Sequence, residues 1–273
     1  MSDQASQEPT YTMGYSDDFQ QMLARRSIHT HAAHLLPHLQ PGQRVLDFGC
    51  GPGTISVGLA QVVDPGEVHG IDMEASQIEM ASAAAEAGGH TNATYHVGDV
   101  TNLPFDDNSF DVAHCHAVLM HVPDTQAALA EVKRVLKPGG LIASRESIIS
   151  SSFLHPGEED TVEAWETFAR LLAGNGGHPE MGLELKANLM TAGFTDIRAS
   201  GSFDFFGSTE DVAFFHGFIN DWFYSPKVTA AIVEFGLASQ EKLDSWQVRI
   251  DEWRDSAGAV GAIAFGEAIA YKP

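Results

Sequence analysis

Residues 45–53 read VLDFGCGPG, and this stretch decides how the chain is expected to fold. It begins as a short apolar segment typical of a buried strand, and Gly49, Gly51 and Gly53 follow at alternate positions. Glycine suits a tight turn from a strand into a helix and lets a ligand approach the backbone closely. The following helix would present free N–H groups at its first turn, which suit a carboxylate or phosphate. The stretch therefore predicts a strand, a ligand-binding turn and a helix.

Strands and helices are expected to alternate around this turn. Short apolar runs are separated by longer runs with helical character. This order is typical of strand–helix–strand units and predicts a parallel sheet with right-handed crossovers. The expected strands are 44–48, 67–71, 93–97, 110–115 and 140–146, and the expected helices are 54–63, 74–87 and 124–136.

The pattern changes before residue 37 and after residue 150, so three parts of one structural domain are expected. Residues 1–36 would form an N-terminal lid, with a polar start and a helix over 17–36 that ends near Pro37. Residues 37–150 would form the ligand-binding core, and residues 151–273 would complete the sheet and add a helical cap. The elements expected in this last part are helices over 161–173 and 183–192, a strand near 194–200, mostly helix over 209–256 and a closing strand over 261–270.

The composition argues against several classes of partner. The chain holds 15 Lys and Arg against 37 Asp and Glu, a formal net charge of −22 at pH 7. Such an acidic surface repels phosphate backbones, and no basic stripe is present, so no nucleic-acid partner is expected. Cys50 and Cys115 both lie in apolar segments, which favours a reducing cytoplasm over a disulfide framework. We find no signal-peptide pattern and no apolar run near the roughly 20 residues of a membrane span.

A carboxylate follows the second expected strand, where a bound nucleoside would place its ribose. Asp72 lies 19 residues after Gly53, and an acidic side chain there can accept hydrogen bonds from both ribose hydroxyls. Asp72 could also cap the next helix, and the two roles are compatible. The NAD-binding pattern G-x-G-x-x-G needs a third glycine where this chain has Thr54, and Pro52 lies inside the turn. The NAD interpretation is therefore disfavoured.

Four motifs in order resemble those of class I S-adenosylmethionine-dependent methyltransferases, of the ubiquinone/menaquinone-biosynthesis-like small-molecule type (methyltransferase type 11). The motifs are VLDFGCGPG (45–53), VHGIDME (68–74), GDVTNLPFDDNSFDVAHCHAVLMHVPD (98–124) and VKRVLKPGGLIASRES (132–147). The resemblance implies an α/β fold with a Rossmann-like, doubly wound sheet. Seven strands are expected, mostly parallel with the last antiparallel, together with the N-terminal helical lid and the C-terminal cap. It also implies S-adenosylmethionine as cofactor and S-adenosylhomocysteine as product.

The same resemblance implies a set of cofactor-binding residues. Asp72 would bind the ribose, Met73 would pack on the adenine ring, and Asp99 would accept a hydrogen bond from its amino group. Each role has a structural alternative, such as Asp47 capping the glycine turn. The implied cofactor-binding residues are Asp47, Gly49, Gly51, Gly53, Asp72, Met73, Asp99, Val100 and His116, with Tyr15 and Arg25 from the lid.

Methyl transfer is an in-line displacement, and the enzyme must hold the nucleophile and the methyl carbon about 3–3.5 Å apart. A base contributes roughly 10²–10⁴-fold when the nucleophile is a neutral hydroxyl or a protonated amine. His116, just past the fourth strand, is the catalytic candidate. His114 faces the same side of that strand, and one of the two could be a core histidine. His29 and His31 are expected on a surface helix, away from the chemistry.

The acceptor should bind outside the carboxyl ends of the strands. Tyr11, Arg145, Trp222 and Tyr224 are the candidates for substrate contact, although Arg145 could instead pair with a neighbour and the aromatic residues could pack in the core. No metal site is expected, because the histidines near the fourth strand lack the converging ligands and second shell that a metal needs.

The expected function is transfer of a methyl group from S-adenosylmethionine to a small-molecule acceptor with an O, N, S or C nucleophile. We expect a cytoplasmic monomer or homodimer. One alternative stays open, in which the protein binds the cofactor without methylating, for another reaction or for structure. The identity of the acceptor is not revealed by the sequence.

Overall fold

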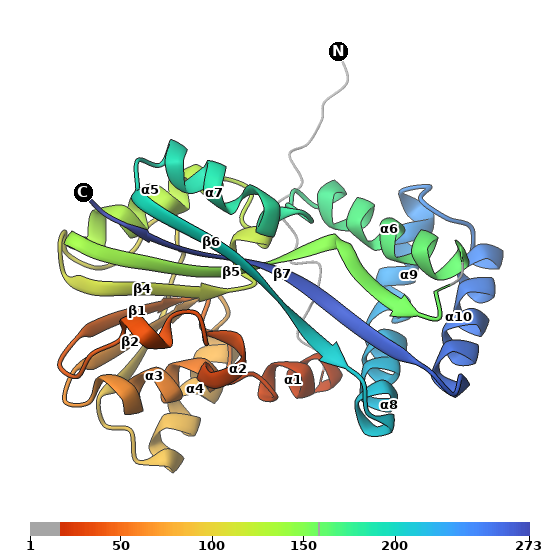
Figure 1. Cartoon of the computed structure of the whole chain (residues 1–273), viewed down its shortest axis with the longest axis horizontal. Coiled ribbons are helices and arrows are strands. Elements are labelled where there is room, and N and C mark those ends of the chain that lie inside the picture. Colours follow the sequence, from red (N-terminus) through yellow and green to blue (C-terminus); the bar gives the residue numbers. More distant parts are fainter. Residues whose placement is uncertain (1–16, 158) are drawn as a thin grey trace.

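The computed structural model describes residues 17–157 and 159–273, which form one seven-stranded sheet with helices on both faces (Figure 1). The strands are β1 (Arg44–Phe48), β2 (Glu67–Asp72), β3 (Ala93–Val97), β4 (Phe110–His116), β5 (Leu136–His155), β6 (Thr195–Phe206) and β7 (Val260–Tyr271). They lie in the order β3-β2-β1-β4-β5-β7-β6. The first five are parallel, and β7 runs antiparallel to β5 and β6. The predicted Rossmann-like sheet with an antiparallel last strand is therefore confirmed.

Both faces of the sheet are buried. Val45 and Val112 pack on the face covered by α3, whereas Leu46 and Ala113 pack on the face covered by α5. Because neighbouring residues of one strand point to opposite faces, covering both faces requires nearly continuous apolar runs. Figure 1 shows α3 and α4 on one side and α5 and α7 on the other. The bounds of these helices are α3 (Thr54–Val63), α4 (Ala75–Gly88), α5 (Thr125–Val135) and α7 (Met181–Thr191).

β5 is much longer than the predicted strand over 140–146. It pairs with β7 from Leu141 to His155, with an irregularity between Ile148 and Phe153. The extra length is stabilised by cross-strand pairing at a distance in sequence, which a local apolar pattern does not report. β5, β6 and β7 consequently reach past the other strands and carry the helical cap at their far ends (Figure 1).

The cap has an aromatic core. The ring of Phe206 on β6 stacks on Phe215 with 4.2 Å between centroids, and Phe168 meets Trp222 edge-on at 4.7 Å. Aromatic pairs in these geometries add to the gain from burial. The cap helices are α6 (Glu159–Gly174), α8 (Thr209–Phe218), the π-helical turn η3 (Ile219–Phe223), α9 (Pro226–Glu234) and α10 (Gln240–Asp255).

No helix among the described residues is long and apolar enough to cross a membrane.

The N-terminal segment is not the single helix predicted over 17–36. It forms α1 (Asp17–Ala24), α2 (Ile28–His31) and the short 3₁₀ turn η1 (Leu36–His38). Ser27, between the first two, has extended backbone angles of φ −147° and ψ 161°. The break follows from packing, since α1 contacts α8 and η3 of the cap whereas α2 contacts α3 beside the sheet. A straight helix would not reach both partners.

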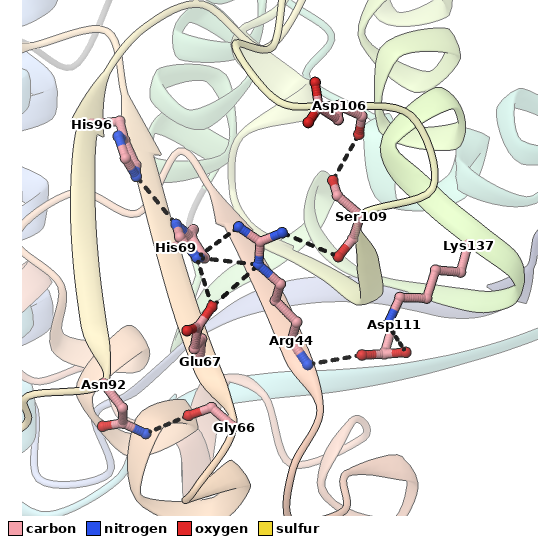
Figure 2. A network of polar contacts seen from close by, with 10 residues as sticks. All are labelled: Arg44, Gly66, Glu67, His69, Asn92, His96, Asp106, Ser109, Asp111 and Lys137. Atoms are coloured by element: carbon pink, nitrogen blue, oxygen red, sulfur yellow. Dashed lines mark hydrogen bonds and ion pairs between the residues drawn. The ribbon is translucent and has the colours of Figure 1, made fainter.

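A polar network extends from the start of β1 across β2 to His96 near the end of β3 (Figure 2). The Arg44 guanidinium lies 3.3 Å from His69 Nε2 and 3.4 Å from a Glu67 carboxylate oxygen. His69 Nδ1 in turn lies 3.2 Å from His96 Nε2. Arg44 begins β1, whereas the glycine turn follows its last residue, Phe48. The Arg44 end of the network therefore lies at the opposite edge of the sheet from the turn, and the network links β1, β2 and β3.

Buried histidines make the stability of the fold depend on pH. Burial lowers the pKa of His34 to about 4, because desolvation disfavours the charged imidazole, and nearby His114 adds to the effect. In the unfolded chain a histidine titrates near pH 6.5, so the unfolded state binds more protons below that pH. The contribution of His34 is therefore fully present above pH 6.5 and is lost as the pH falls toward 4, by about 2 kcal/mol at pH 4.5.

We expect the free energy of unfolding, measured by urea titration, to fall between pH 7 and pH 4.5. In His34→Gln that dependence should become shallower by about 2 kcal/mol across the range. His29 is exposed, so His29→Gln should keep the dependence of the wild type. Equal slopes in the His34 variant and the wild type would contradict this account.

Candidate active site

A cavity of about 420 Å³ lies at the carboxyl ends of β1, β2 and β4. Seven of the predicted site residues line it, which are Gly49, Gly51, Asp72, Met73, Asp99, Val100 and His116. Open parallel sheets bind ligands at this edge, because the loops after neighbouring strands converge there. The cavity continues toward the cap, where Leu172, Asn175 and Gly177 line its other end.

The three glycines of the turn have left-handed backbone angles, but they serve different purposes. Their φ values are +67° at Gly49, +53° at Gly51 and +77° at Gly53. A Cβ on Gly49 would overlap the Val118 side chain, and one on Gly53 would lie 2.8 Å from the Cβ of Ala81. A Cβ on Gly51 would meet a single side-chain oxygen at 3.8 Å. Gly51 therefore presents its backbone to the cavity, whereas Gly53 supports the turn from behind.

Asp72 connects the glycine turn to the second strand. Its carboxylate accepts hydrogen bonds from the Gly51 N–H at 2.9 Å and the Glu74 N–H at 3.0 Å. Burial raises the pKa of Asp72, and the two N–H groups oppose that rise. The cap of α4 is formed by Glu74, whose side chain accepts from the Ser76 N–H. Asp72 thus lines the cavity with oxygen lone pairs that remain available to ribose hydroxyls.

The neighbouring loop provides surfaces that fit an adenine ring. Met73 lines the cavity with 70% of its surface exposed, so a flat apolar ring could pack on it. Asp99 accepts a hydrogen bond from the Thr101 N–H at 2.8 Å through one oxygen. The Gln77 Oε1 atom is buried and has no partner among the described residues. An exposed thioether beside carboxylate and amide acceptors suits the adenosine portion of S-adenosylmethionine, which the residues present therefore fit.

His116 lies at the inner end of the cavity and is 5% exposed. Its ring nitrogens have no hydrogen-bond partner among the described residues. Burial lowers the pKa of His116 well below its usual range, and the Arg26 and Arg145 charges lower it further. The imidazole is therefore neutral at physiological pH and can accept a hydrogen bond or a proton from a molecule in the cavity.

His31 corrects the expectation that the His29/His31 pair is remote from the site. Its ring meets that of His116 edge-on with 5.0 Å between centroids. Its Nε2 atom lies 3.3 Å from an Asp204 carboxylate oxygen. The break after α1 directs α2 against the sheet, and this packing brings His31 inward.

Asp47 and His114 form a pair behind the cavity. The Asp47 carboxylate lies 2.8 Å from His114 Nδ1 and accepts a hydrogen bond from the Ser56 hydroxyl. Both residues are buried, and neither is among the described residues that line the cavity. Of the two histidines on β4, His114 is thus the core residue. Asp47 supports the first turn of α3 rather than facing the cofactor.

Arg25 points away from the expected cofactor contact. Its guanidinium lies 3.2 Å from the Asp211 carboxylate and 4.0 Å from the centre of the Phe214 ring, both on α8. The next residue, Arg26, lines the cavity instead. Since α1 ends at Ala24 and packs on the cap, Arg25 continues toward the cap whereas Arg26 turns inward.

Three residues predicted to contact the substrate lie outside the described lining of the cavity. Arg145 is 1% exposed, and its guanidinium lies 2.8 Å from Asp204 and 3.5 Å from Glu267 across the sheet. Trp222 is buried in the aromatic core of the cap, and Tyr224 packs edge-on against Phe223. None of the three is among the described residues that line the cavity. Tyr11 and Tyr15 lie outside the described residues.

Several lining residues were not predicted from the sequence. They come from the lid, from the first turn of α4, from the segment after β4 and from the end of α6 and the loop that follows it, and no single motif covers all of these segments. The basic pair at Arg25 and Arg26 was a signal for the lid, but it did not reveal which arginine turns inward. Within the described part of the chain, no cluster of His, Cys, Asp and Glu could hold a metal ion. The unpredicted lining residues include Leu23, Arg26, Gln77, Val118, His121, Leu172, Asn175 and Gly177.

Comparisons with known proteins identify the family of this chain. The family profile described as "Methyltransferase domain" matches residues 39–182. An uncharacterized methyltransferase of Schizosaccharomyces pombe is 31% identical over 207 residues, which cover 71% of this chain and 74% of that protein. Demethylmenaquinone methyltransferase of Staphylococcus haemolyticus is 40% identical over 112 residues, which cover 40% of this chain and 46% of that protein.

A solved structure shows the same fold. Phosphoethanolamine N-methyltransferase 2 of Haemonchus contortus, in complex with S-adenosylhomocysteine, has a TM-score of 0.55 at 20% identity, covering 86% of this chain and 49% of that one. The family profile over residues 39–182 and the Schizosaccharomyces pombe relative show that this chain belongs to the methyltransferase-domain family. The predicted class I, S-adenosylmethionine-dependent methyltransferase is confirmed at that level.

We expect Asp72→Asn to weaken binding of S-adenosylmethionine by about 10- to 100-fold, as loss of a charged hydrogen-bond acceptor would. The fold should survive, because the ionised carboxylate is itself costly to bury. Isothermal calorimetry provides the measurement. Asp124→Asn is the control, since Asp124 lines the cavity but caps α5 through the Ala127 N–H. Equal affinity in wild type and Asp72→Asn would remove Asp72 from the cofactor site.

Gly51→Ala should reduce cofactor affinity at least tenfold, because the added methyl enters the space beside the turn. Left-handed backbone also costs alanine about 1 kcal/mol of stability. Gly89→Ala is the matched control, since Gly89 has φ +72° and nothing within 4 Å of its Cβ position. Both variants should lose similar stability on thermal melting, but Gly89→Ala should bind the cofactor normally. Equal losses of cofactor affinity in Gly51→Ala and Gly89→Ala would show that both substitutions act through stability alone.

Proposed function

We propose that this protein methylates a small, largely apolar acceptor that binds beside His116, in the half of the cavity nearest the cap. The observation that carries the proposal is the continuity of one cavity. It runs from Asp72 and Met73, which suit the adenosine of the cofactor, to Leu172 at the end of α6. Donor and acceptor in one enclosed space can be aligned for in-line displacement.

The protein contributes orientation and a proton acceptor. S-adenosylmethionine supplies an electrophilic methyl group on a cationic sulfonium. The turn at Gly51 and the Asp72 carboxylate would hold the donor, and the His116 imidazole would face the acceptor in the same cavity. Its neutral imidazole can accept the proton that the nucleophile loses, with the electron pair of the broken bond staying on the nucleophilic atom.

The charges around His116 favour an acidic nucleophile. A histidine whose pKa is lowered by burial and by Arg26 is a weak base, so it suits an acceptor that gives up its proton readily. Burial and Arg26 lower the pKa of His121 as well, to about 3. Arg26 lines the same space and would repel an ammonium group but stabilise a forming anion.

These charges support a phenol, enol or thiol as the acceptor and argue against an amine. The apolar side chains of Leu23, Val122 and Leu172 would contact its carbon skeleton. The name of the Staphylococcus haemolyticus relative, demethylmenaquinone methyltransferase, is compatible with a quinol-like acceptor. A cytoplasmic location and the absence of nucleic-acid partners are part of the same proposal. They rest on the net charge of −22 and on two cysteines that are both free and buried.

The test is transfer of isotopically labelled methyl from S-adenosylmethionine to a panel of phenols, enols, thiols and amines, with a low-mass cell extract included. Labelled phenol, enol or thiol products would support the proposal. Methylation confined to amines would contradict the acceptor class. Binding of the donor without S-adenosylhomocysteine formation across the panel would favour the non-methylating alternative.

His116→Gln should lower the transfer rate at saturating substrates by about 10²–10⁴-fold and change the cofactor Kd less than threefold. Because the pKa of His116 lies well below 6.5, its neutral form persists as the pH falls. The wild-type rate should therefore show no loss from this group between pH 8 and pH 6. Initial rates measured across that range provide the check, with His29→Gln as the surface control. An unimpaired His116 variant would exclude the residue as the proton acceptor.

A further inference from the structure

Glu146 holds one wall of the cavity through backbone hydrogen bonds. It lies on β5 and is fully buried. Its Oε1 atom accepts from the N–H groups of Val118 at 3.1 Å and Leu119 at 3.0 Å, and its Oε2 atom accepts from Met120 at 3.1 Å. One carboxylate therefore binds three consecutive amides of the loop that follows β4.

The arrangement depends on an ionised carboxylate. Both oxygens act as acceptors, whereas a protonated oxygen would direct its own hydrogen toward an N–H group. Burial raises the pKa of Glu146, and the three amides oppose that rise. An amide side chain would present an NH₂ group to one of the three N–H donors. Glutamine has nearly the shape of glutamate but cannot make the same contacts.

The loop held by Glu146, residues 117–121, contains the single 3₁₀ turn η2 (Leu119–His121) and touches both halves of the cavity. It begins at Ala117, whose φ of +53° is unusual for a residue with a Cβ. The Val118 side chain occupies the space beside the Gly49 backbone in the glycine turn. Ala117, Val118 and His121 all line the cavity. The loop therefore packs against the glycine turn at one end and lines the part of the cavity nearest the cap at the other.

The far end of the loop is tied to the cap. The Met120 carbonyl accepts a hydrogen bond from the His178 N–H at 2.7 Å. A Cβ on Gly177 would also come within 2.8 Å of that carbonyl, so the two segments are in close contact. A shift of the loop would consequently move both the surface against Gly49 and the segment that closes the acceptor space.

We propose that Glu146 is a positioning residue, whose three hydrogen bonds to residues 118–120 place the loop that aligns the donor with the acceptor. The expected effect on methyl transfer rests on the proposed function. The expected effect on cofactor binding does not, and it can be tested without any acceptor. Misplacement of a wall by about 1 Å can cost a hundredfold in rate, so exact placement of the loop matters for transfer.

The experiment measures the affinity of Glu146→Gln for S-adenosylhomocysteine by calorimetry, at a temperature where every variant is folded. We expect binding about tenfold weaker than in the wild type. Hydrogen exchange followed by mass spectrometry should show faster exchange in the peptide covering 117–122, with 93–97 unchanged. Glu146→Asp retains a carboxylate and should recover part of the affinity. Val118→Ala keeps the backbone hydrogen bonds and should also weaken binding, through the contact with Gly49.

Glu267→Gln is the matched control. Glu267 is a buried carboxylate on the neighbouring strand that accepts from the hydroxyls of Ser200 and Ser202. This variant should melt at a lower temperature yet bind S-adenosylhomocysteine within threefold of the wild type. Wild-type affinity in Glu146→Gln, or equal losses in the Glu146 and Glu267 variants, would overturn the proposal. A failure to find an acceptor would affect the proposed function and leave this result standing.

Discussion

The hydrogen bond from the Gly51 N–H to the Asp72 carboxylate is the interaction on which the site depends. The glycine turn requires left-handed backbone at three positions, and such a turn needs partners that hold it in place. The N–H groups of Gly49 and Cys50 both donate to the Ile71 carbonyl, and the next N–H group, that of Gly51, donates to the Asp72 carboxylate. The end of β2 thereby secures the turn after β1, and α3 begins in a defined direction.

Asp72 and Glu146 use the same physical device at two places. Asp72 ends β2 and Glu146 lies in the middle of β5, and the carboxylate oxygens of each accept backbone N–H groups of a loop that lines the cavity. Backbone donors can balance a buried negative charge without a salt bridge, and they also fix the geometry of the loop. Two loops from β1 and β4 are thus held by side chains of β2 and β5. The cavity wall is therefore attached to the sheet through these hydrogen bonds.

Below the cavity the chain buries several ionisable groups, and burial itself lowers the pKa of His116, with neighbouring positive charges adding to the effect. Arg145 is paired with Asp204 and Glu267, while His114 is paired with Asp47. Breaking such a pair would leave a buried charge uncompensated, which is strongly destabilising. The positive charge of Arg145 remains close enough to disfavour protonation of His116. The packing of Arg145 in the sheet therefore contributes to the protonation state of His116.

The sequence by itself determined the strand order along the chain and the residues of the cavity beside the glycine turn, whereas only the tertiary structure decided which residues line its end near the cap. Gly51 and Asp72 lie in short segments where a strand ends and a loop begins, so local pattern predicts them, and the motif resemblance adds Asp99. Arg26, His31 and Glu146 acquire their roles through contacts between segments far apart in the chain. Apolar periodicity records which face of an element is buried, but it does not record which distant segment covers that face. Arg25 and Arg26 are adjacent and chemically alike, and only the packing of α1 on the cap turns one outward and the other toward the cavity.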